Sequence, residues 1–105
     1  MIARATMAEV DPVRTSVGDA VVVFQDSVLP ALREQDGFEG AYVLLSSEGK
    51  VLALTFWTDE EAADAGVESG FYLDQVRKFV TVFKAPPGRE TYEVVVAETA
   101  TPAAG

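Results

Sequence analysis

The chain contains no cysteine and no histidine. Without cysteine it can form no disulfide bond, no zinc–thiolate site and no cysteine nucleophile. Without histidine it can form no imidazole–haem bond, no Ser-His-Asp triad and no histidine-rich metal site. Any acid–base chemistry must therefore use carboxylates, lysine, tyrosine, the substrate itself or water.

Positive charge is also scarce, because 8 Lys and Arg residues face 17 Asp and Glu residues and give a net charge of −9. Nucleic acids and anionic membrane surfaces repel such a protein, so we expect neither as a partner. No apolar run approaches the roughly 20 residues of a membrane span. Met1 to Arg4 do not begin a signal peptide. We therefore expect a cytoplasmic protein.

The length of 105 residues suits one domain with a modest two-layer core. Apolar residues make up 49% of the chain, which excludes an intrinsically disordered protein. We expect a single domain over residues 1–98. The small and polar residues 99–105 predict a flexible C-terminal tail.

The first third of the chain predicts a strand from Ile2 to Glu9 and then a helix. Asp11 and Pro12 are typical of a helix start, since aspartate accepts from a free backbone N–H and proline fits the first helical position. Pro30 predicts a kink, after which the helix should resume to about Gln35. Apolar residues recur every three or four positions, as on a helix that lies on a sheet: Val13, Val17, Ala20, Val21, Phe24, Val28, Ala31 and Leu32.

The middle of the chain predicts a hairpin and the start of a second helical segment. Strands from Gly40 to Leu45 and from Val51 to Trp57 flank a polar turn that contains Gly49. Thr58, with Glu61 three residues later, has the spacing of a capping box. We therefore expect a helix to begin at Thr58.

The last third predicts a break, a helix and a closing strand. Gly66 and Gly70 interrupt the second helical segment. An apolar stripe follows from Phe71 to Phe83, and a valine-rich strand covers about Glu90 to Ala97. The fold class is therefore α+β: a ferredoxin-like β-α-β-β-α-β chain with a four-stranded antiparallel sheet.

Both faces of the predicted strands are apolar, and two helices can cover only one face of four strands. A bare second face would expose more than the ~300–600 Å² of contiguous apolar surface that monomers tolerate. A two-fold homodimer that packs sheet on sheet would cover it. The alternative is a monomer with a mildly apolar surface.

This order of elements resembles the dimeric α/β-barrel superfamily, and within it the antibiotic-biosynthesis-monooxygenase-like domain. Three motifs carry the resemblance, which covers about residues 2–97: a strand that ends in Phe56-Trp57, the acidic sequence Thr58-Asp59-Glu60-Glu61, and the valine-rich last strand. The resemblance implies a homodimer whose two sheets form an α/β barrel. It also implies an enzyme similar to the cofactor-independent monooxygenases of aromatic, polyketide-type substrates, with no cofactor. The haem-degrading members are excluded, because their ligand is a histidine.

Five residues are candidates for a ligand pocket. The cofactor-independent oxygenases have a tryptophan at the end of the third strand, which corresponds to Trp57; the asparagine that they also use is absent here. Tyr72 follows the Gly70 break, Phe79 lies on the same helical stripe, and Tyr42 lies in a strand. Arg4 is a charge within the first strand.

Each candidate also has a structural interpretation. Trp57 could orient a substrate oxygen with its indole N–H or could bridge sheet and helix, and Tyr72 could simply pack in the core. Tyr42 could pack at the interface, and Arg4 could pair with Glu93 across the sheet. The acidic residues after Trp57 suit a helix N-terminus, so we expect no metal site.

Two functions from different classes fit the sequence. The first is a small-molecule enzyme of the cofactor-free monooxygenase type, whose ligand would lie between helices and sheet near Trp57, Tyr72 and Phe79. The second is a non-catalytic dimeric protein that binds a small apolar or aromatic ligand. A purely structural protein without a pocket is a third possibility.

Overall fold

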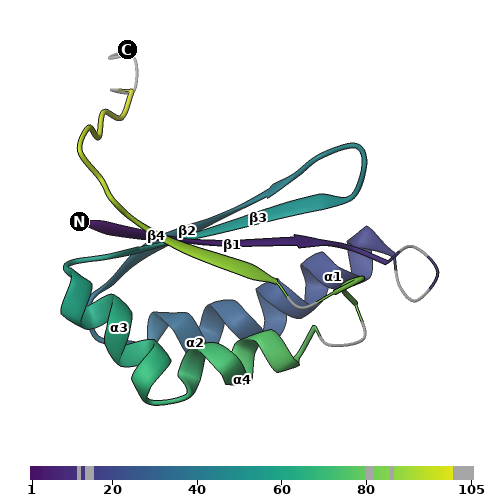
Figure 1. Ribbon diagram of the computed structural model, residues 1–105, viewed down its shortest axis with the longest axis horizontal. Coiled ribbons are helices and arrows are strands. Elements are labelled where there is room, and N and C mark those ends of the chain that lie inside the picture. Colours follow the sequence, from purple (N-terminus) through teal and green to yellow (C-terminus); the bar gives the residue numbers. More distant parts are fainter. Residues whose placement is uncertain (12, 14–15, 80–81, 86, 101–105) are drawn as a thin grey trace, which may run out of the picture.

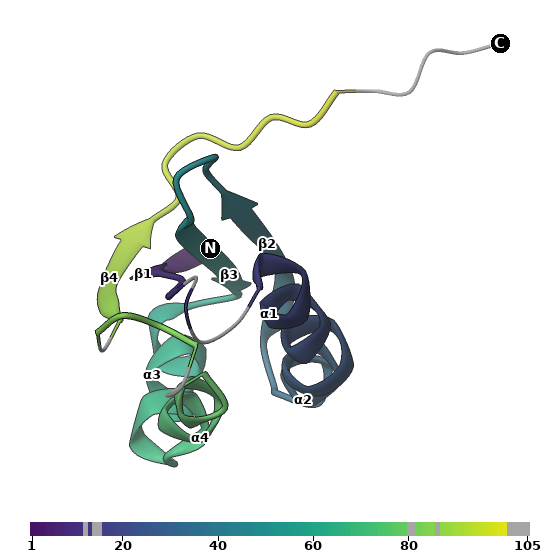
Figure 2. The same ribbon diagram turned by 90° about the vertical axis from the view of Figure 1, so that its right-hand side faces the viewer.

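The structure is a computed structural model that describes residues 1–11, 13, 16–79, 82–85 and 87–100. One sheet lies above a layer of helices (Figure 1), and the helices form two pairs that both lie under the same face (Figure 2). In chain order the elements are β1 (Ile2–Glu9), α1 (Val17–Val23), the π-helical turn η1 (Phe24–Val28), α2 (Leu29–Arg33), β2 (Phe38–Leu45), β3 (Lys50–Trp57), α3 (Glu60–Glu68), α4 (Phe71–Arg77) and β4 (Gly88–Glu93).

The four strands are in the order β2-β3-β1-β4, and each neighbouring pair is antiparallel. The predicted ferredoxin-like α+β fold class is therefore confirmed. Because β1 is a central strand, its side chains have neighbours on both sides. Arg4 lies opposite Thr55 of β3 and Thr91 of β4, and Thr6 lies opposite Ala53 and Arg89. These residues share the face that the helices cover.

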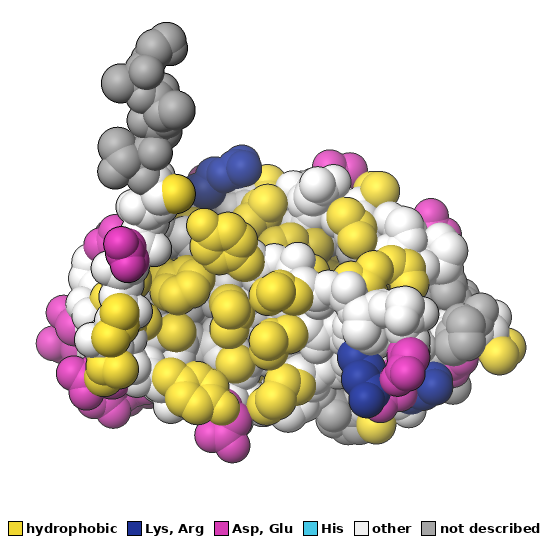
Figure 3. Space-filling view, turned by 90° about the horizontal axis from the view of Figure 1, so that it is seen from above, with side chains coloured by type: hydrophobic (Ala, Val, Ile, Leu, Met, Phe, Trp, Pro, Cys, Tyr) yellow, Lys and Arg dark blue, Asp and Glu magenta, His cyan; other side chains and the backbone are white. Residues whose placement is uncertain are grey.

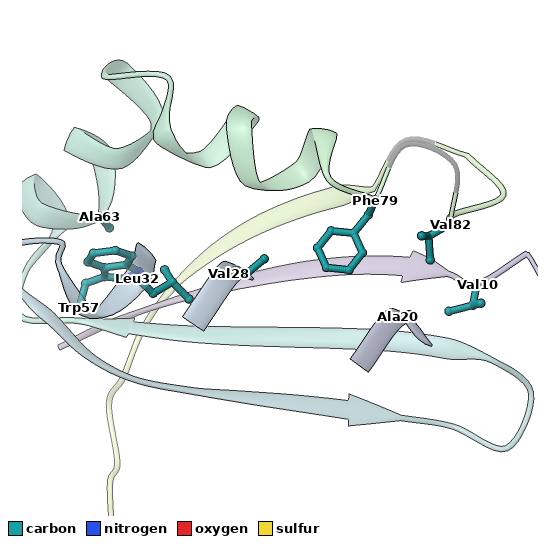
Figure 4. Packing of buried hydrophobic residues seen from close by; sticks show 8 residues of the cluster. All are labelled: Val10, Ala20, Val28, Leu32, Trp57, Ala63, Phe79 and Val82. Atoms are coloured by element: carbon teal, nitrogen blue, oxygen red, sulfur yellow. The ribbon is translucent and has the colours of Figure 1, made fainter. Parts of the chain in front are cut away.

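The hydrophobic core lies between that face and the helices (Figure 4). Residues from every layer contribute, because alternate strand residues and one stripe of each helix point inward. Trp57 is its largest side chain and is 4% exposed. The buried cluster consists of Val10, Ala20, Val28, Leu32, Trp57, Ala63, Phe79 and Val82.

The first helix begins later than predicted. Ser16 is the N-cap of α1, and its hydroxyl accepts from the backbone N–H of Asp19 at 3.1 Å. Asp11 instead accepts from the backbone N–H of Val13 at 3.0 Å, which is an Asx turn. The predicted cap at Asp11 was therefore wrong, and Pro12 lies outside the described residues.

The predicted disturbance at Pro30 takes the form of a π-helical turn. The backbone N–H of Leu29 donates to the carbonyl of Phe24, five residues earlier. Proline follows at the first turn of α2, where its missing N–H costs little. The helix then ends at Arg33, two residues before the predicted end.

Asp59 caps α3 in place of Thr58. Its carboxylate accepts from the backbone N–H of Ala62 at 2.8 Å. The backbone N–H of Thr58 donates to the carbonyl of Gly37 at 2.9 Å, so Thr58 still belongs to the extended chain that leaves β3. The predicted capping box of Thr58 and Glu61 was therefore wrong by one residue.

The predicted glycine break lies at one glycine only. Gly66 is a buried residue inside α3. Gly70, with φ +84°, separates α3 from α4. Residues with a side chain adopt this conformation only at a cost in energy, whereas glycine adopts it freely. Gly70 is therefore the residue that breaks the segment.

The last helix and strand are shorter than predicted. The helix α4 ends at Arg77 rather than Phe83, and Phe83 forms an isolated antiparallel bridge with Val10. The backbone N–H of Lys84 donates to the carbonyl of Glu9 at 2.9 Å, so this part of the chain pairs with the end of β1. The strand β4 ends at Glu93 rather than Ala97, although Val94 adds one further hydrogen bond to Met1.

The other face of the sheet is bare (Figure 3). It carries a broad apolar surface, because the strand residues that alternate with Arg4 and Thr6 are apolar. A groove of about 860 Å³ at one end of this face includes Met7, Leu44 and Leu52 in its lining. The apolar side chains of the face, which we call the open face, are Ala3, Ala5, Met7, Tyr42, Leu44, Leu52, Leu54, Phe56 and Tyr92.

Candidate functional site

A cavity of about 90 Å³ lies between the helices and the sheet. Strands β1 and β3 form its floor, and both helix pairs form its walls. Four of the five candidate residues line it: Arg4, Trp57, Tyr72 and Phe79. The described residues that complete the lining are Thr6, Phe24, Val28, Leu32, Ala53, Thr55, Gly66, Phe71, Gln75, Val76 and Phe83.

Trp57 is the last residue of β3 and closes one end of the cavity. Its ring packs edge to face against Phe38, with centroids 5.6 Å apart. Its indole N–H donates to the hydroxyl of Thr55 at 3.0 Å. The N–H therefore already has an acceptor in the sheet, and Trp57 presents its apolar ring to the cavity.

Tyr72, in the first turn of α4, is held by contacts to its hydroxyl and to its ring. Its hydroxyl forms a hydrogen bond of 2.9 Å with the hydroxyl of Thr6, in which either oxygen can donate. The guanidinium carbon of Arg89 lies 5.1 Å from the centre of its ring, a distance suited to a cation–π interaction. These contacts fix the phenol at the cavity wall.

Arg4 is buried, with 5% of its surface exposed. Its guanidinium donates to the carbonyl of Ala63 at 2.6 Å, to Asp64 at 3.2 Å and to the hydroxyl of Thr91 at 3.3 Å. The expected partner Glu93 was wrong, since Glu93 lies opposite Ile2. Arg4 therefore joins β1, β4 and α3, and Asp64 balances its charge.

Tyr42 lies away from the cavity. It is 67% exposed on the open face and packs edge to face against Phe56, with centroids 6.0 Å apart.

Phe79 does line the cavity, and its ring stacks on that of Phe83, with centroids 5.3 Å apart. Thr6 was not predicted as a site residue, although its spacing of two residues from Arg4 places both on one face of a strand.

The chemistry of the cavity is apolar with a few hydroxyl groups. Among the described residues that line it, Arg4 and Tyr72 carry the titratable side chains, and none is a carboxylate or lysine. In the described part of the chain, no three His, Cys, Asp or Glu side chains are placed to hold a metal ion. Nor does any helix there have the length and apolar character to cross a membrane. The cavity thus suits a small apolar molecule with an oxygen atom that can hydrogen-bond to Tyr72 or Thr6.

Solved structures share this fold along nearly the whole chain. A monooxygenase from the gene ActVA-Orf6 of Streptomyces coelicolor, in complex with Nanaomycin D, has a TM-score of 0.74 at 19% identity, with 95% of this chain and 92% of that chain covered. SnoaB, a cofactor-independent oxygenase from Streptomyces nogalater, has a TM-score of 0.70 at 13% identity, with 97% of each chain covered. NE2512, a protein of unknown function from Nitrosomonas europaea, has a TM-score of 0.72 at 19% identity, with 95% and 94% covered.

Sequence comparison gives shorter matches. No protein-family model matches the chain. Two uncharacterised proteins of Mycobacterium tuberculosis, Rv2558 and MT2635, are each 39% identical to it over 67 residues. The match covers 63% of this chain and 28% of the length of each relative. The structural comparisons confirm the predicted resemblance at the level of the fold.

Proposed function

We propose that this chain, which has the fold of the antibiotic-biosynthesis-monooxygenase-like proteins, binds a small aromatic molecule and oxygenates it without a bound metal ion or cofactor. The observation that carries the proposal is the cavity between helices and sheet, where aromatic walls meet the hydrogen-bonded hydroxyls of Tyr72 and Thr6. Aromatic walls with a few placed polar groups are typical of small-molecule sites.

In this proposal the substrate supplies the electrons. A phenol or anthrone that loses a proton becomes an electron-rich anion, which can react with O2 directly. At a methylene carbon, the balanced reaction removes two hydrogens, adds one oxygen atom as a carbonyl and releases the second oxygen atom as water. In a phenol or quinol the two hydrogens come from the hydroxyl and from a ring C–H, and the product is a quinone. The apolar walls exclude bulk water, and the Tyr72 hydroxyl orients the substrate oxygen. Because no described lining residue is a carboxylate or lysine, the Tyr72 hydroxyl or a water molecule must relay the substrate proton.

The size of the cavity limits the substrate. About 90 Å³ is well below the ~300–1,000 Å³ of a pocket for a drug-sized ligand. A single ring is therefore favoured over a rigid polycycle, which would require α4 to move outward. Gly70 at the start of α4 is a suitable hinge, because its backbone has no side chain to restrict it.

Oxygen uptake tests the proposal. With a single-ring phenol or quinol as substrate, the protein should accelerate uptake more than with an anthrone, and both Trp57→Ala and Tyr72→Phe should lower kcat/KM. Loss of one hydrogen bond corresponds to a loss of up to about tenfold for Tyr72→Phe. The control is Tyr92→Phe, which removes the same hydroxyl from the open face and should change nothing. Uptake that is indifferent to the protein would refute the proposal.

A non-catalytic binding protein is the alternative function. The indole N–H of Trp57 and the guanidinium of Arg4 already have hydrogen-bond partners within the fold. Polar groups that are engaged in this way favour a binding protein over an enzyme. The chain has 1 tryptophan, so a fluorescence titration reports on this cavity alone. Saturable quenching by phenols without oxygen uptake would favour binding over catalysis.

We also propose that a second copy of the chain covers the open face. This proposal is supported by Figure 3, where the apolar side chains form one broad surface rather than single scattered residues. Residues 1–98 would form the domain, and residues 99–105 a flexible tail, of which 101–105 lie outside the described residues.

A further inference from the structure

A second cavity, of about 50 Å³, lies between α1 and the sheet. Every described residue that lines it is apolar, so a water molecule there would find no side-chain partner. The lining consists of Val10, Val17, Ala20, Val21, Phe24, Val43, Leu45, Val51, Ala53, Phe79 and Phe83.

The two cavities share part of their walls. Phe24, Ala53, Phe79 and Phe83 line both of them. Figure 4 shows Phe79 between the group of Trp57, Leu32 and Val28 on one side and Ala20 with Val10 on the other. Phenylalanine rings therefore form the partition between two neighbouring spaces.

The cavities follow one another along β3. Thr55 and Trp57 line the first cavity, Val51 lines the second, and Ala53 lines both. At about 3.3 Å per residue, Val51 and Thr55 are roughly 13 Å apart along the strand. A molecule that occupied both spaces would be long and narrow.

We propose that the two cavities bind one ligand, a phenol or quinol ring that carries a short alkyl chain. The ring lies in the first cavity, where Tyr72 and Thr6 can bond its oxygen, and the chain passes the phenylalanine partition into the second. The chain is alkyl because the second cavity offers its polar atoms no partner. This inference rests on the proposed function and names the substrate class for the same site.

Chain length is the variable that tests the inference. We would titrate the fluorescence of Trp57 with phenol and with 4-alkylphenols of one to six carbons. Each methylene that enters the second cavity should tighten binding about fourfold, the equivalent of one buried CH₂. The gain should end after a few carbons, when the second cavity is full. Affinity that does not depend on chain length, or that rises without end, would overturn the proposal.

A variant that fills the second cavity should remove the gain. Ala20→Leu places a larger side chain there, so the alkylphenols should bind no better than phenol, and phenol itself should bind as before. Val21→Phe is a second variant at the rim of the same cavity, and its half-exposed position tolerates a larger residue. The control is Val22→Leu on the exposed side of α1. Equal losses for phenol and alkylphenols in both variants would contradict the inference.

The binding assay also separates this inference from the proposed function. Chain-length-dependent binding without oxygen uptake would uphold the shared cavities and refute the oxygenase. Oxygen uptake with phenols of every chain length at the same kcat/KM would refute the shared cavities alone.

Discussion

Gly66 and Gly70 are four residues apart and differ in what their backbone requires. A methyl group at Gly66 would lie 3.8 Å from the ring of Phe71, an ordinary contact, in a helical conformation. A methyl group at Gly70 would meet nothing within 4 Å, but φ is +84° there. There is therefore space for the side chain of alanine at both positions, but only at Gly66 does the backbone have a conformation that alanine adopts without strain.

Replacement of each glycine by alanine should have opposite effects on stability. Gly66→Ala should raise the free energy of unfolding by up to about 1 kcal/mol, because alanine favours the helix over glycine. Gly70→Ala should lower it by about 1–2 kcal/mol, the cost of the left-handed conformation. Urea unfolding measures both, and equal shifts of the same sign would contradict this assignment.

The Gly66 variant also separates stability from binding. Gly66 lines the first cavity, so its new methyl group should weaken the binding of phenol to a protein that is more stable. A variant in which stability and affinity rise together would show that the cavity does not hold the ligand.

Arg4 illustrates how far a single residue could be predicted. Its charge within an apolar strand marked it in the sequence as a residue that needs a partner. The partner could not be predicted, because Asp64 and Ala63 come from a helix about 60 positions later, whose placement depends on the packing of the whole chain. Strand pairing alone suggested Glu93, but the residue of β4 that lies opposite Arg4 is Thr91, two positions earlier.

At the scale of the element, the π-helical turn η1 explains how the apolar stripe of the first helical segment keeps facing the sheet. In a regular α-helix, the eight steps from Phe24 to Leu32 would rotate the side chain about 80° past two full turns. One extra residue in the turn at η1 removes most of this offset. Phe24, Val28 and Leu32 therefore all face inward.

We expect packing, rather than Pro30, to hold this turn. In Pro30→Ala the π turn should persist, and the free energy of unfolding should change by less than about 1 kcal/mol, since the residue lies in the first turn of α2. The structure of the variant, by crystallography or NMR, checks this. A straight helix with a new bond from residue 30 to the carbonyl of Asp26, together with a gain near 3 kcal/mol, would instead make proline the cause.

Element boundaries were predicted less well than element types. Strands β1, β2 and β3 lie where alternation predicted them, to within two residues at their ends. The predicted valine-rich strand was partly wrong, since β4 overlaps it only over Glu90–Glu93 and its valines lie beyond the strand. The helix predicted to reach Phe83 stops at Arg77, and the chain beyond it pairs with residues at the end of β1: the backbone N–H of Lys84 donates to the carbonyl of Glu9, and that of Asp11 donates to the carbonyl of Val82. Periodicity along one segment carries no information about such distant partners.

At the scale of the whole molecule, the open face is the largest feature without a cover. The sequence predicted it from strands that are apolar on both sides, and the structure shows which side is bare (Figure 3). The cavities could not be predicted in size, since they depend on how closely helices and sheet approach.

A charge on the open face should separate two copies of the chain. The unmodified protein should sediment at about twice its mass of 11.2 kDa. Leu44→Glu places a carboxylate on the open face, where it would be buried without a partner, and should give the single-chain mass at micromolar concentration. Val22→Glu is the matched control, because Val22 is 51% exposed on α1 and Leu44 is 49% exposed. An unmodified protein that sediments at the mass of one chain would refute the homodimer.

The order of the strands has a consequence for synthesis on the ribosome. The strand β1 is central in the sheet, and both of its neighbours, β3 and β4, follow it in the sequence. Translation must therefore pass through β4 before β1 has both partners and before Arg4 meets Thr91, 87 positions later. Contacts this distant in sequence form slowly. Until then β1 stays open at one edge, a state in which chaperones can bind the nascent chain.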